Sequence, residues 1–505
     1  MLSDLSALSG PLSAALREAF QATGYHADGV LDLLGAQAHT ALGRGEPEPA
    51  RRASRDAGEL GTLVRLLLLG DPEPAGAVEA ALPGVRTGDL IAAGLLAPDG
   101  DRLRAALDVR PYGDDEGSWW VFADLDADQR PDRRVPADHV LGIGHASLSL
   151  ARATMRRPVG SLLDLGAGCG VQTLHASRHA RSLTATDLSE RALSLARATF
   201  AINELDVRTE RGSWFEPVAG RRFDQVVCNP PFVVGPPRVD FTYRDSGLAG
   251  DGASELVVRG LPDVLAEGGV GQLLASWLHL PGEDWAHRVA AWLPDTGVDA
   301  WFVQRDVADP ALYVGTWLRD AGIDPRSPQG SAQASAWLDW FAENDVAGIG
   351  FGFVTLRRTP DGTPTHVDCE DLRQAFDDPL GPEAAGWLDR VDWLRRNDTR
   401  EALLDTAFTV PRTVVLERVA EPGSEGWAEL VRRLHRMDGP GWQHEVDELT
   451  SALLAGCQGA LPLRELLALL AGAHGLDSAS LVDAAVPVVV DLLRHGMLLP
   501  PELAG

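Results

Sequence analysis

An Asn-Pro-Pro-Phe run at Asn229, Pro230, Pro231 and Phe232 is the segment of this chain best suited to chemistry. It follows an apolar stretch at 223–228 that predicts a buried strand. Two prolines fix the backbone and remove N–H donors, so the carbonyl groups stay available as acceptors. The Asn229 side-chain oxygen and the Pro230 carbonyl would accept the N–H bonds of a planar nitrogen, and Phe232 would cover its flat face. Such a clamp would turn the nitrogen lone pair toward an electrophilic methyl group by positioning and electrostatics.

A glycine-rich turn at 164–170 comes earlier in the chain, between a predicted strand and a predicted helix, and contains Asp164, Gly166, Gly168 and Gly170. Glycines permit backbone torsions and a close ligand approach that a Cβ would block. Asp187 ends the next predicted strand, 17 residues after the last glycine, where a carboxylate can accept hydrogen bonds from both ribose hydroxyls. Nicotinamide enzymes share both features, and an ordinary tight turn with a helix-capping aspartate also fits them. The Asn-Pro-Pro-Phe run favours a methyltransferase, because nicotinamide chemistry has no use for it.

The elements that must position these residues alternate between strand and helix patterns, which is typical of a parallel α/β sheet. The predicted strands lie at 161–165, 182–186, 205–209, 223–228, 270–277, 298–304 and 348–356. Helices are expected at 171–180 and 190–201, the second capped by Ser189. Seven strands predict a Rossmann-like, doubly wound α/β domain over residues 140–358.

Mainly helical regions are expected on both sides of this domain. Residues 1–110 form the first, with helical spacing at 12–20 and 60–69; helices followed by an Asp99-Gly100 turn predict a winged-helix-like module. Residues 111–139 are expected to be a connector. Residues 359–505 form the second region, winged-helix-like at 461–500, with helices at 463–470, 480–485 and 486–494. Two unrelated small helical domains are the alternative.

Composition restricts the partners. The formal net charge is −28, and all 45 basic residues are arginine. Residues 1–110 and 441–505 are both net acidic, so nucleic acid is a less favoured partner than protein. The four scattered cysteines form no CxxC pair, which argues against disulfides and metal. No signal peptide or apolar run long enough for a membrane span is visible, so no membrane partner and a cytoplasmic location are expected.

Residues from about 140 to 269 resemble class I S-adenosylmethionine-dependent methyltransferases of the HemK/PrmC and "methyltransferase small domain" group, because the quoted motifs occur in the group's order and spacing. The resemblance implies that Asp164, Gly166, Gly168, Gly170, Asp187 and Leu188 hold the cofactor S-adenosyl-L-methionine, and that Asn229 to Phe232 hold the acceptor. His145, in the run Gly142 to Ser147, corresponds to a loop over the methionine end of the cofactor. Ser213, followed by Trp214, stands where the related enzymes have an aspartate that bonds adenine.

The chain is therefore expected to be an N-methyltransferase, with a protein glutamine amide as the expected acceptor. The Val-Val and Pro-Pro that follow Phe232 resemble the release-factor enzymes of eukaryotes and archaea. Methylation of an RNA or DNA base is one alternative, and a cofactor-binding interaction protein without turnover is another. The intact clamp argues against the latter. The segment from Tyr243 to Gly252 suits a lid or a plain surface loop equally, and the sequence gives no oligomeric state.

Overall fold

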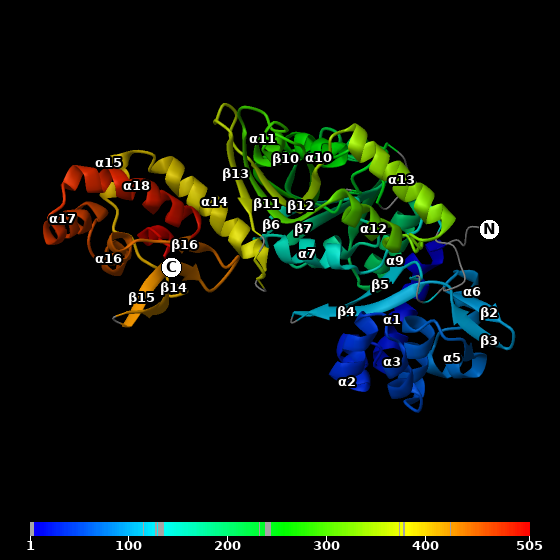
Figure 1. The fold of residues 1–505 in the computed structure, drawn as a ribbon. Helices are drawn as coiled ribbons and strands as arrows, with labels where there is room; N and C mark the ends of the chain where they lie inside the picture. Colours follow the sequence, from blue (N-terminus) through cyan, green and yellow to red (C-terminus); the bar gives the residue numbers. More distant parts are fainter. Residues whose placement is uncertain are drawn as a thin grey trace. The chain divides into compact units, whose positions relative to one another are not determined.

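The computed structural model describes residues 5–114, 116–126, 129, 136–231, 233–237, 244–372, 374–376, 379–424 and 426–504. The chain forms two compact units. The first contains Met1–Ala151 and Arg157–Asp371, and the second contains Arg152–Arg156 and Leu372–Gly505. The N-terminal helices and the central sheet thus belong to one unit (Figure 1).

The described part of the first unit begins with a short 3-10 helix and three α-helices. These are η1 (Leu5–Ser9), α1 (Pro11–Thr23), α2 (Ala27–Gly43) and α3 (Glu48–Ser54). The helix predicted at 12–20 is confirmed as α1, which begins at Pro11 and stops at Gly24, whose φ is 74°. The His26 side chain caps α2 by accepting a hydrogen bond from the Gly29 N–H at 3.1 Å.

Residues 58–105 have the element order of a winged helix. The elements are α4 (Gly58–Leu63), a π-helical turn η2 (Val64–Leu68), β1 (Glu73–Pro74), α5 (Ala75–Ala81), α6 (Thr87–Ala92), β2 (Leu96–Asp99) and β3 (Arg102–Ala105). The strands pair antiparallel in the order β1-β3-β2. The predicted turn at Asp99 and Gly100 joins β2 to β3, and Gly100 has a φ of 64° that favours glycine.

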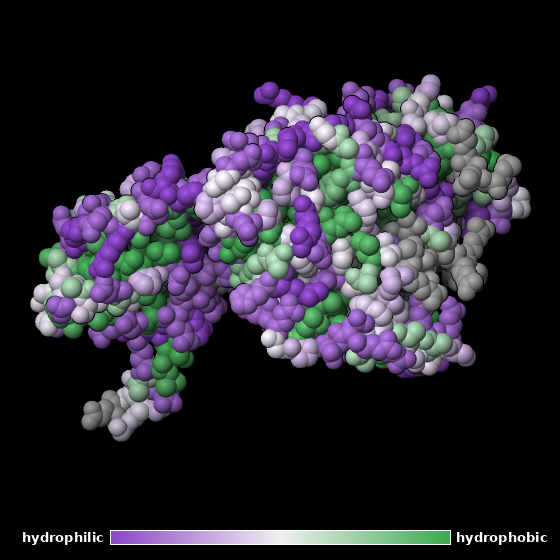
Figure 2. All heavy atoms as spheres, turned by 90° about the horizontal axis from the view of Figure 1, so that it is seen from above, coloured by the Kyte–Doolittle hydropathy of each residue, from purple (hydrophilic) through white to green (hydrophobic). Residues whose placement is uncertain are grey.

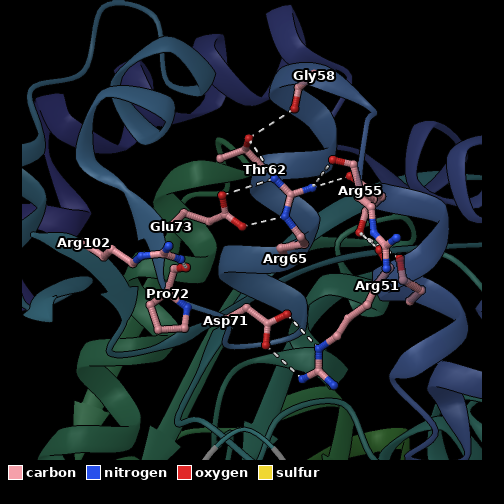
Figure 3. Close-up of polar contacts among 11 residues, drawn as sticks. Arg51, Arg55, Gly58, Thr62, Arg65, Asp71, Pro72, Glu73 and Arg102 are labelled. Atoms are coloured by element: carbon pink, nitrogen blue, oxygen red, sulfur yellow. Dashed lines mark hydrogen bonds and ion pairs between the residues drawn. The ribbon is translucent and has the colours of Figure 1, made fainter.

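Two arginines join this module to the helix before it (Figure 3). Arg65 pairs with both oxygens of Glu73, at 2.5 and 3.2 Å, and also donates to the carbonyl oxygen of Ser54 at the end of α3. Arg51 of α3 makes a second bidentate pair with Asp71, at 2.8 and 2.9 Å. Carbonyls at a helix C-terminus have no partner within the helix, so Arg65 satisfies one of them while it fixes β1. These arginines serve the fold of an acidic module.

The central sheet of the first unit has eight strands. They are β6 (Val159–Leu165), β7 (Ala180–Asp187), β8 (Val207–Arg211), β9 (Phe223–Cys228), β10 (Leu265–His279), β11 (Val298–Ala308), β12 (Gly348–Arg358) and β13 (His366–Asp371). Their order is β13-β11-β12-β10-β9-β6-β7-β8. All seven predicted strands are present, and β13 is an eighth. The parallel pattern expected from the sequence holds except at β12, which pairs antiparallel with β10 and β11.

Helices cover both faces of this sheet (Figure 1). They are α7 (His145–Ala153), α8 (Val171–Ala176), α9 (Glu190–Ile202), α10 (Gly252–Val264), α11 (Trp285–Ala290), α12 (Pro310–Asp320) and α13 (Pro328–Glu343), together with the 3-10 turn η4 (Glu216–Val218). Leu163 and Leu165 pack in one core with α10 and α11, whereas Leu162 points to the opposite face, toward α8. The alternation follows from the two-residue period of a strand. The Rossmann-like strand-and-helix alternation predicted for this region is thereby confirmed.

The N-terminal module, residues 5–105, packs against helices α8 and α9, which cover the second face of the sheet. One core contains its buried residues together with Cys169, Val171 and Leu174 beside the glycine-rich turn, and with Ile202 of α9. A hairpin of β4 (Asp108–Asp114) and β5 (Gly117–Ala123) lies between the two regions, where the sequence predicted a connector. The hairpin therefore joins the two regions through packed contacts and not only through the chain.

Polar contacts from the end of this hairpin fix it to α9. Asp124 is buried and forms a bidentate ion pair with Arg191, whose Nε lies 2.9 Å from the carboxylate. The same carboxylate accepts a hydrogen bond from the Val140 N–H at 2.9 Å. Trp120 N–H donates to the Asn203 side chain at 3.0 Å. Asp124 thus connects β5, the segment before α7, and the sheet-covering helix.

The second unit combines helices with a three-stranded sheet. Its elements are α14 (Leu380–Arg396), α15 (Arg400–Leu404), β14 (Val414–Gly423), β15 (Gly426–Arg436), β16 (Gln443–Glu445), α16 (Glu448–Gly456), α17 (Leu463–His474), α18 (Ser478–Arg494) and η5 (Pro501–Leu503). The helices predicted at 480–485 and 486–494 are one helix, α18, with Pro487 inside it. The winged-helix-like interpretation of 461–500 stays a prediction. Strands β14 and β15 form a long hairpin that projects from the unit and exposes hydrophobic side chains (Figure 2).

Within the described residues, no helix combines the length and the apolar character needed to cross a membrane.

Candidate active site

The register of the central sheet brings three predicted site segments to one edge. Leu165 at the end of β6 pairs with Thr186 of β7 and with Cys228 of β9. The next residue in each strand or loop is Gly166, Asp187 or Asn229. Because these strands are parallel, the glycine-rich turn, the acidic residue and the Asn-Pro-Pro segment all leave the same, carboxyl edge of the sheet. Ligands of open α/β sheets bind at this edge.

Backbone hydrogen bonds hold the glycine-rich turn in place, and two of its glycines leave free space beside it. The N–H groups of Gly166 and Ala167 both donate to the Thr186 carbonyl at 2.9 Å. Gly166 and Gly168 have φ values of 77° and 56°, and a Cβ on either would meet nothing within 4 Å. Gly170 differs, because its φ is 90° and a Cβ would lie 2.5 Å from the Phe200 ring. Gly170 is therefore required by packing, whereas Gly166 and Gly168 leave free space.

Asp164 is a buried carboxyl group tied to the start of α8. One of its oxygens accepts hydrogen bonds from the N–H and the hydroxyl of Thr173, at 3.0 and 2.7 Å. Its other oxygen is buried and has no hydrogen-bond partner among the described residues. Burial raises the pKa of Asp164 to about 7, with Asp187 adding a smaller repulsion. The site thus contains an unused acceptor whose charge is unfavourable without a cationic partner.

Asp187 accepts hydrogen bonds from backbone groups with both of its oxygens. Gly168 N–H donates to one at 2.9 Å and Ser189 N–H to the other at 2.8 Å. Burial raises the pKa of Asp187, although these hydrogen bonds act in the opposite direction. Leu188 follows with an exposed side chain. The predicted cap is confirmed, because the Ser189 hydroxyl accepts from the Ala192 N–H at 3.2 Å.

Ser213 and Trp214 lie in the loop after β8. The Gly212 N–H donates to the Asp187 carbonyl at 3.1 Å, so this loop is next to the acidic residue. Trp214 has a φ of 48°, which is uncommon for a residue other than glycine. Both side chains are half-buried. The structure therefore brings Ser213 and Trp214 to the same edge as Asp187, as the resemblance implied.

Asn229 and Pro230 directly follow β9, and Pro231 comes next. The Asn229 Oδ1 atom is buried and lacks a hydrogen-bond partner within the part of the chain that the structure describes. Pro230 is buried and Pro231 is half-buried. Phe232, the fourth residue of the predicted clamp, lies outside the described residues. An asparagine oxygen without a partner is an acceptor available to a ligand N–H.

His145 begins α7, and its side chain is exposed. The segment around it is anchored, because the Gln172 side-chain amide donates to the Ser147 carbonyl at 2.7 Å and Ile143 packs against the shared core. Sequence reasoning missed both Gln172 and Thr173. They are ordinary polar residues in the first turn of α8, and only their hydrogen bonds connect them to the site.

Comparison with known proteins agrees with this geometry. The sequence model described as "Methyltransferase small domain" matches residues 142–244, which span the glycine-rich turn, Asp187 and the clamp. Residues 142–244 are a methyltransferase small domain. This match confirms the resemblance of these residues to class I S-adenosylmethionine-dependent methyltransferases of the HemK and small-domain group. Two domains of unknown function match on either side, DUF7059 at residues 22–106 and DUF7782 at residues 385–500.

Relatives of the methyltransferase domain differ in their acceptors. A release factor glutamine methyltransferase from Deinococcus radiodurans is 33% identical over 154 residues, which cover 26% of this chain and 52% of that protein. A ribosomal RNA small subunit methyltransferase C from Escherichia coli is 31% identical over 119 residues, covering 23% and 31%. The chain thus spans about half, or less, of the length of these relatives. A solved T. thermophilus 16S rRNA methyltransferase, in complex with AdoMet and guanosine, aligns over 40% of this chain and 55% of its own, with 18% identity and a TM-score of 0.27.

The residues of the methyltransferase domain fit the cofactor of this class. S-adenosylmethionine carries a ribose, an adenine and a cationic methionine end. The Asp187 carboxylate would suit the ribose hydroxyls, the open space at Gly166 and Gly168 would admit a close ligand, and the buried Asp164 oxygen would suit a cation. In the described part of the chain, no three His, Cys, Asp or Glu side chains are grouped to hold a metal.

Proposed function

We propose that this protein is an S-adenosylmethionine-dependent N-methyltransferase that methylates a planar nitrogen. The observation that carries the proposal is the Asn229 side-chain oxygen, which is buried without a described partner one residue beyond the strand that flanks the glycine-rich turn. A buried acceptor left without a partner is unfavourable, so its presence is best explained by a ligand that donates to it.

Each site residue has a role in this proposal. Asp164 binds the methionine end of the cofactor, and His145 lies near the same end. The glycines Gly166, Gly168 and Gly170 let the cofactor lie close to the backbone of the turn. Asp187 accepts the ribose hydroxyls, and the adenine lies among Leu188, Ser213 and Trp214. The acceptor nitrogen is held by the residues Asn229, Pro230, Pro231 and Phe232.

The proposed chemistry is positioning of a poor nucleophile. The lone pair of an amide or exocyclic nitrogen is delocalised, and hydrogen bonds from its N–H groups to Asn229 Oδ1 and the Pro230 carbonyl hold that lone pair in line with the electrophile. S-adenosylmethionine, when bound, supplies a methyl group on a sulfonium centre. The new N–C bond forms as the S–C bond breaks, and the nitrogen proton, acidified by alkylation, leaves to solvent. No strong base is needed, so Asn229 contributes by orientation and electrostatics.

A protein glutamine amide is the proposed acceptor. The chain has a net charge of −28, which opposes a phosphate backbone, and the D. radiodurans relative is named for release factor glutamine. Two arginines of the N-terminal module, Arg51 and Arg65, are engaged in internal pairs. An RNA base is the second candidate, because the E. coli relative is named for ribosomal RNA.

A competition assay with tritiated S-adenosylmethionine separates these acceptors. Purified protein is incubated with release factors, total RNA and genomic DNA, and the labelled fraction is identified. Label in a protein glutamine supports the proposal. Label in RNA, with binding that weakens steeply as salt rises, would replace it with the base-methylating function.

Substitution of Asn229→Ala tests the clamp itself. Loss of this oriented acceptor is expected to lower kcat about a hundredfold or more, with cofactor affinity nearly unchanged, because Asn229 contacts the acceptor. Asn203→Ala is the matched control, since the Asn203 side chain bonds only to Trp120 and Thr199 in the hydrogen bonds described, at 2.7–3.0 Å. The control should lower stability and leave kcat intact. Near wild-type turnover by Asn229→Ala would remove the clamp mechanism.

A further inference from the structure

The segment that follows the clamp is held by an insertion in the sheet. Helices α12 and α13 lie between β11 and β12, next to one another (Figure 1). They form a small core with Val233 and Val234, to which Leu278 of β10 and Ile349 of β12 also belong. This core is separate from the one that contains Leu163 and Leu165. Tyr313, Val314 and Leu318 of α12 and Trp337 and Phe341 of α13 belong to this core. The residues just after the clamp therefore pack into the insertion.

Hydrogen bonds fix the same residues one after another. Val233 N–H donates to the Arg244 carbonyl at 3.2 Å, and Val234 N–H donates to the Tyr313 hydroxyl at 2.8 Å. The Gly235 carbonyl accepts from Gly250 N–H at 3.0 Å. Of these three hydrogen bonds, only the one from the Val234 N–H has a side-chain acceptor. Val234 is completely buried, so its N–H has no access to solvent in place of Tyr313.

Arg244, at the start of the described part of the segment from Tyr243 to Gly252, also contacts α12. Its side chain is only 3% exposed, it donates to the Trp317 carbonyl at 3.0 Å, and it pairs with Asp245 at 3.2 Å. This part of the segment from Tyr243 to Gly252 is therefore anchored. Tyr243 lies outside the described residues, and whether the segment closes as a lid stays a prediction.

We propose, on the basis of the proposed function, that Tyr313 is a positioning residue that sets the placement of the acceptor clamp through the Val234 N–H. Pro230 and Pro231 have fixed φ angles, so few backbone torsions between Asn229 and Val234 can absorb a shift. A displacement at Val234 is therefore transmitted to the Asn229 side chain, where misplacement by a fraction of an ångström lowers the rate. Burial raises the pKa of Tyr313, so the phenol keeps its proton and its oxygen remains a neutral acceptor.

The test is Tyr313→Phe, with Tyr25→Phe as the matched control. Both tyrosines are buried, and each hydroxyl makes a backbone hydrogen bond, in Tyr25 by donation to the Val109 carbonyl at 2.7 Å. Tyr25 lies in the N-terminal module, outside the proposed site. We expect Tyr313→Phe to lower kcat about tenfold while the Kd for S-adenosylmethionine changes less than twofold. Tyr25→Phe should leave kcat unchanged at a temperature where it remains folded.

Amide hydrogen exchange of residues 229–237 provides a readout that does not need turnover. Tyr313→Phe should increase exchange at Val233 and Val234, and Tyr25→Phe should not. Unchanged exchange, or a fall in kcat matched by an equal loss of folded protein, would overturn the positioning role. Absence of wild-type turnover with every acceptor would instead refute the proposed function, while the exchange result would still decide whether Tyr313 fixes this segment.

Discussion

Replacement of Asp164 by asparagine is expected to stabilise the ligand-free protein and to weaken cofactor binding. The pKa of this carboxyl group rises from an ordinary 3.8 to about 7 because it is buried. Converted at 1.36 kcal/mol for each pH unit, this shift corresponds to a cost of about 4 kcal/mol for ionising Asp164 in the folded protein. Asparagine has the same shape, and its carbonyl oxygen can accept both hydrogen bonds from Thr173. Asp164→Asn should therefore remove the cost while keeping the local structure.

The sign of the pH dependence follows from the raised pKa. The folded state binds the Asp164 proton more tightly than the unfolded state, so the wild-type stability present at pH 4 declines as the pH rises toward 7. The variant lacks this decline. The difference in the free energy of unfolding between variant and wild type should be close to zero at pH 4 and approach about 4 kcal/mol at pH 8. Cofactor affinity should fall tenfold or more, because a charge-assisted contact to a cation is lost.

Calorimetric melts at pH 4, 5, 6, 7 and 8, together with titration of S-adenosylmethionine, measure both effects. Asp224→Asn is the matched control. Asp224 also accepts from one N–H and one hydroxyl, both of Ser161, at 2.8 and 3.0 Å, but it lies near the start of β9 and is half-buried. The control should leave the affinity for S-adenosylmethionine unchanged. A pH-independent difference for Asp164→Asn would refute the argument from burial.

Two further substitutions test the turn and the contact with the N-terminal module. Gly170→Ala should cost about 3 kcal/mol of stability, since its Cβ would lie 2.5 Å from the Phe200 ring at a φ of 90°. Gly168→Ala should cost only about 1 kcal/mol and should mainly reduce the affinity for the cofactor. Thermal melts and cofactor titration distinguish the two variants, and equal losses of stability would contradict this prediction. Arg191→Met should lower the free energy of unfolding by about 2 kcal/mol, because it leaves the buried Asp124 without its cation. Arg197→Met removes an exposed pair with Glu190 and should lower it by less than about 0.5 kcal/mol. Similar melting temperatures for the two variants would show that the Asp124 pair contributes little.

The sequence predicted the central sheet well because its strands are short apolar runs between turns. The exceptions have physical causes. The direction of β12 depends on the connection through α12 and α13, and apolar composition is the same for either direction. Strand β13, at the sheet edge, alternates polar and apolar residue types and is mostly half-buried, so no apolar run marks it. The glycine-rich turn and Asp187 could be placed because their spacing reflects a strand-turn-helix unit.

The hairpin of the second unit shows why a strand can resemble a helix in sequence. Trp427, Leu430, Val431 and Leu434 have helical spacing, yet they lie in β15. A register shift between Val419 and Ala420, where β15 passes Leu430, interrupts the two-residue period. Contacts such as Tyr313 with Val234, 79 residues apart, were equally invisible, because no local pattern encodes a partner so distant.

The segment matched by the family model is shorter than the compact unit that contains it. Residues 142–244 are the part that relatives have in common, yet they supply only β6 to β9 of the sheet. Strand β10 and helices α10 and α11 come later in the chain, and the outer side of α9 is covered by η1, α1 and β5 from before it. On their own, residues 142–244 would therefore expose apolar surface on both sides of their part of the sheet. The segment that the family model matches is thus smaller than the compact unit that buries its apolar surface.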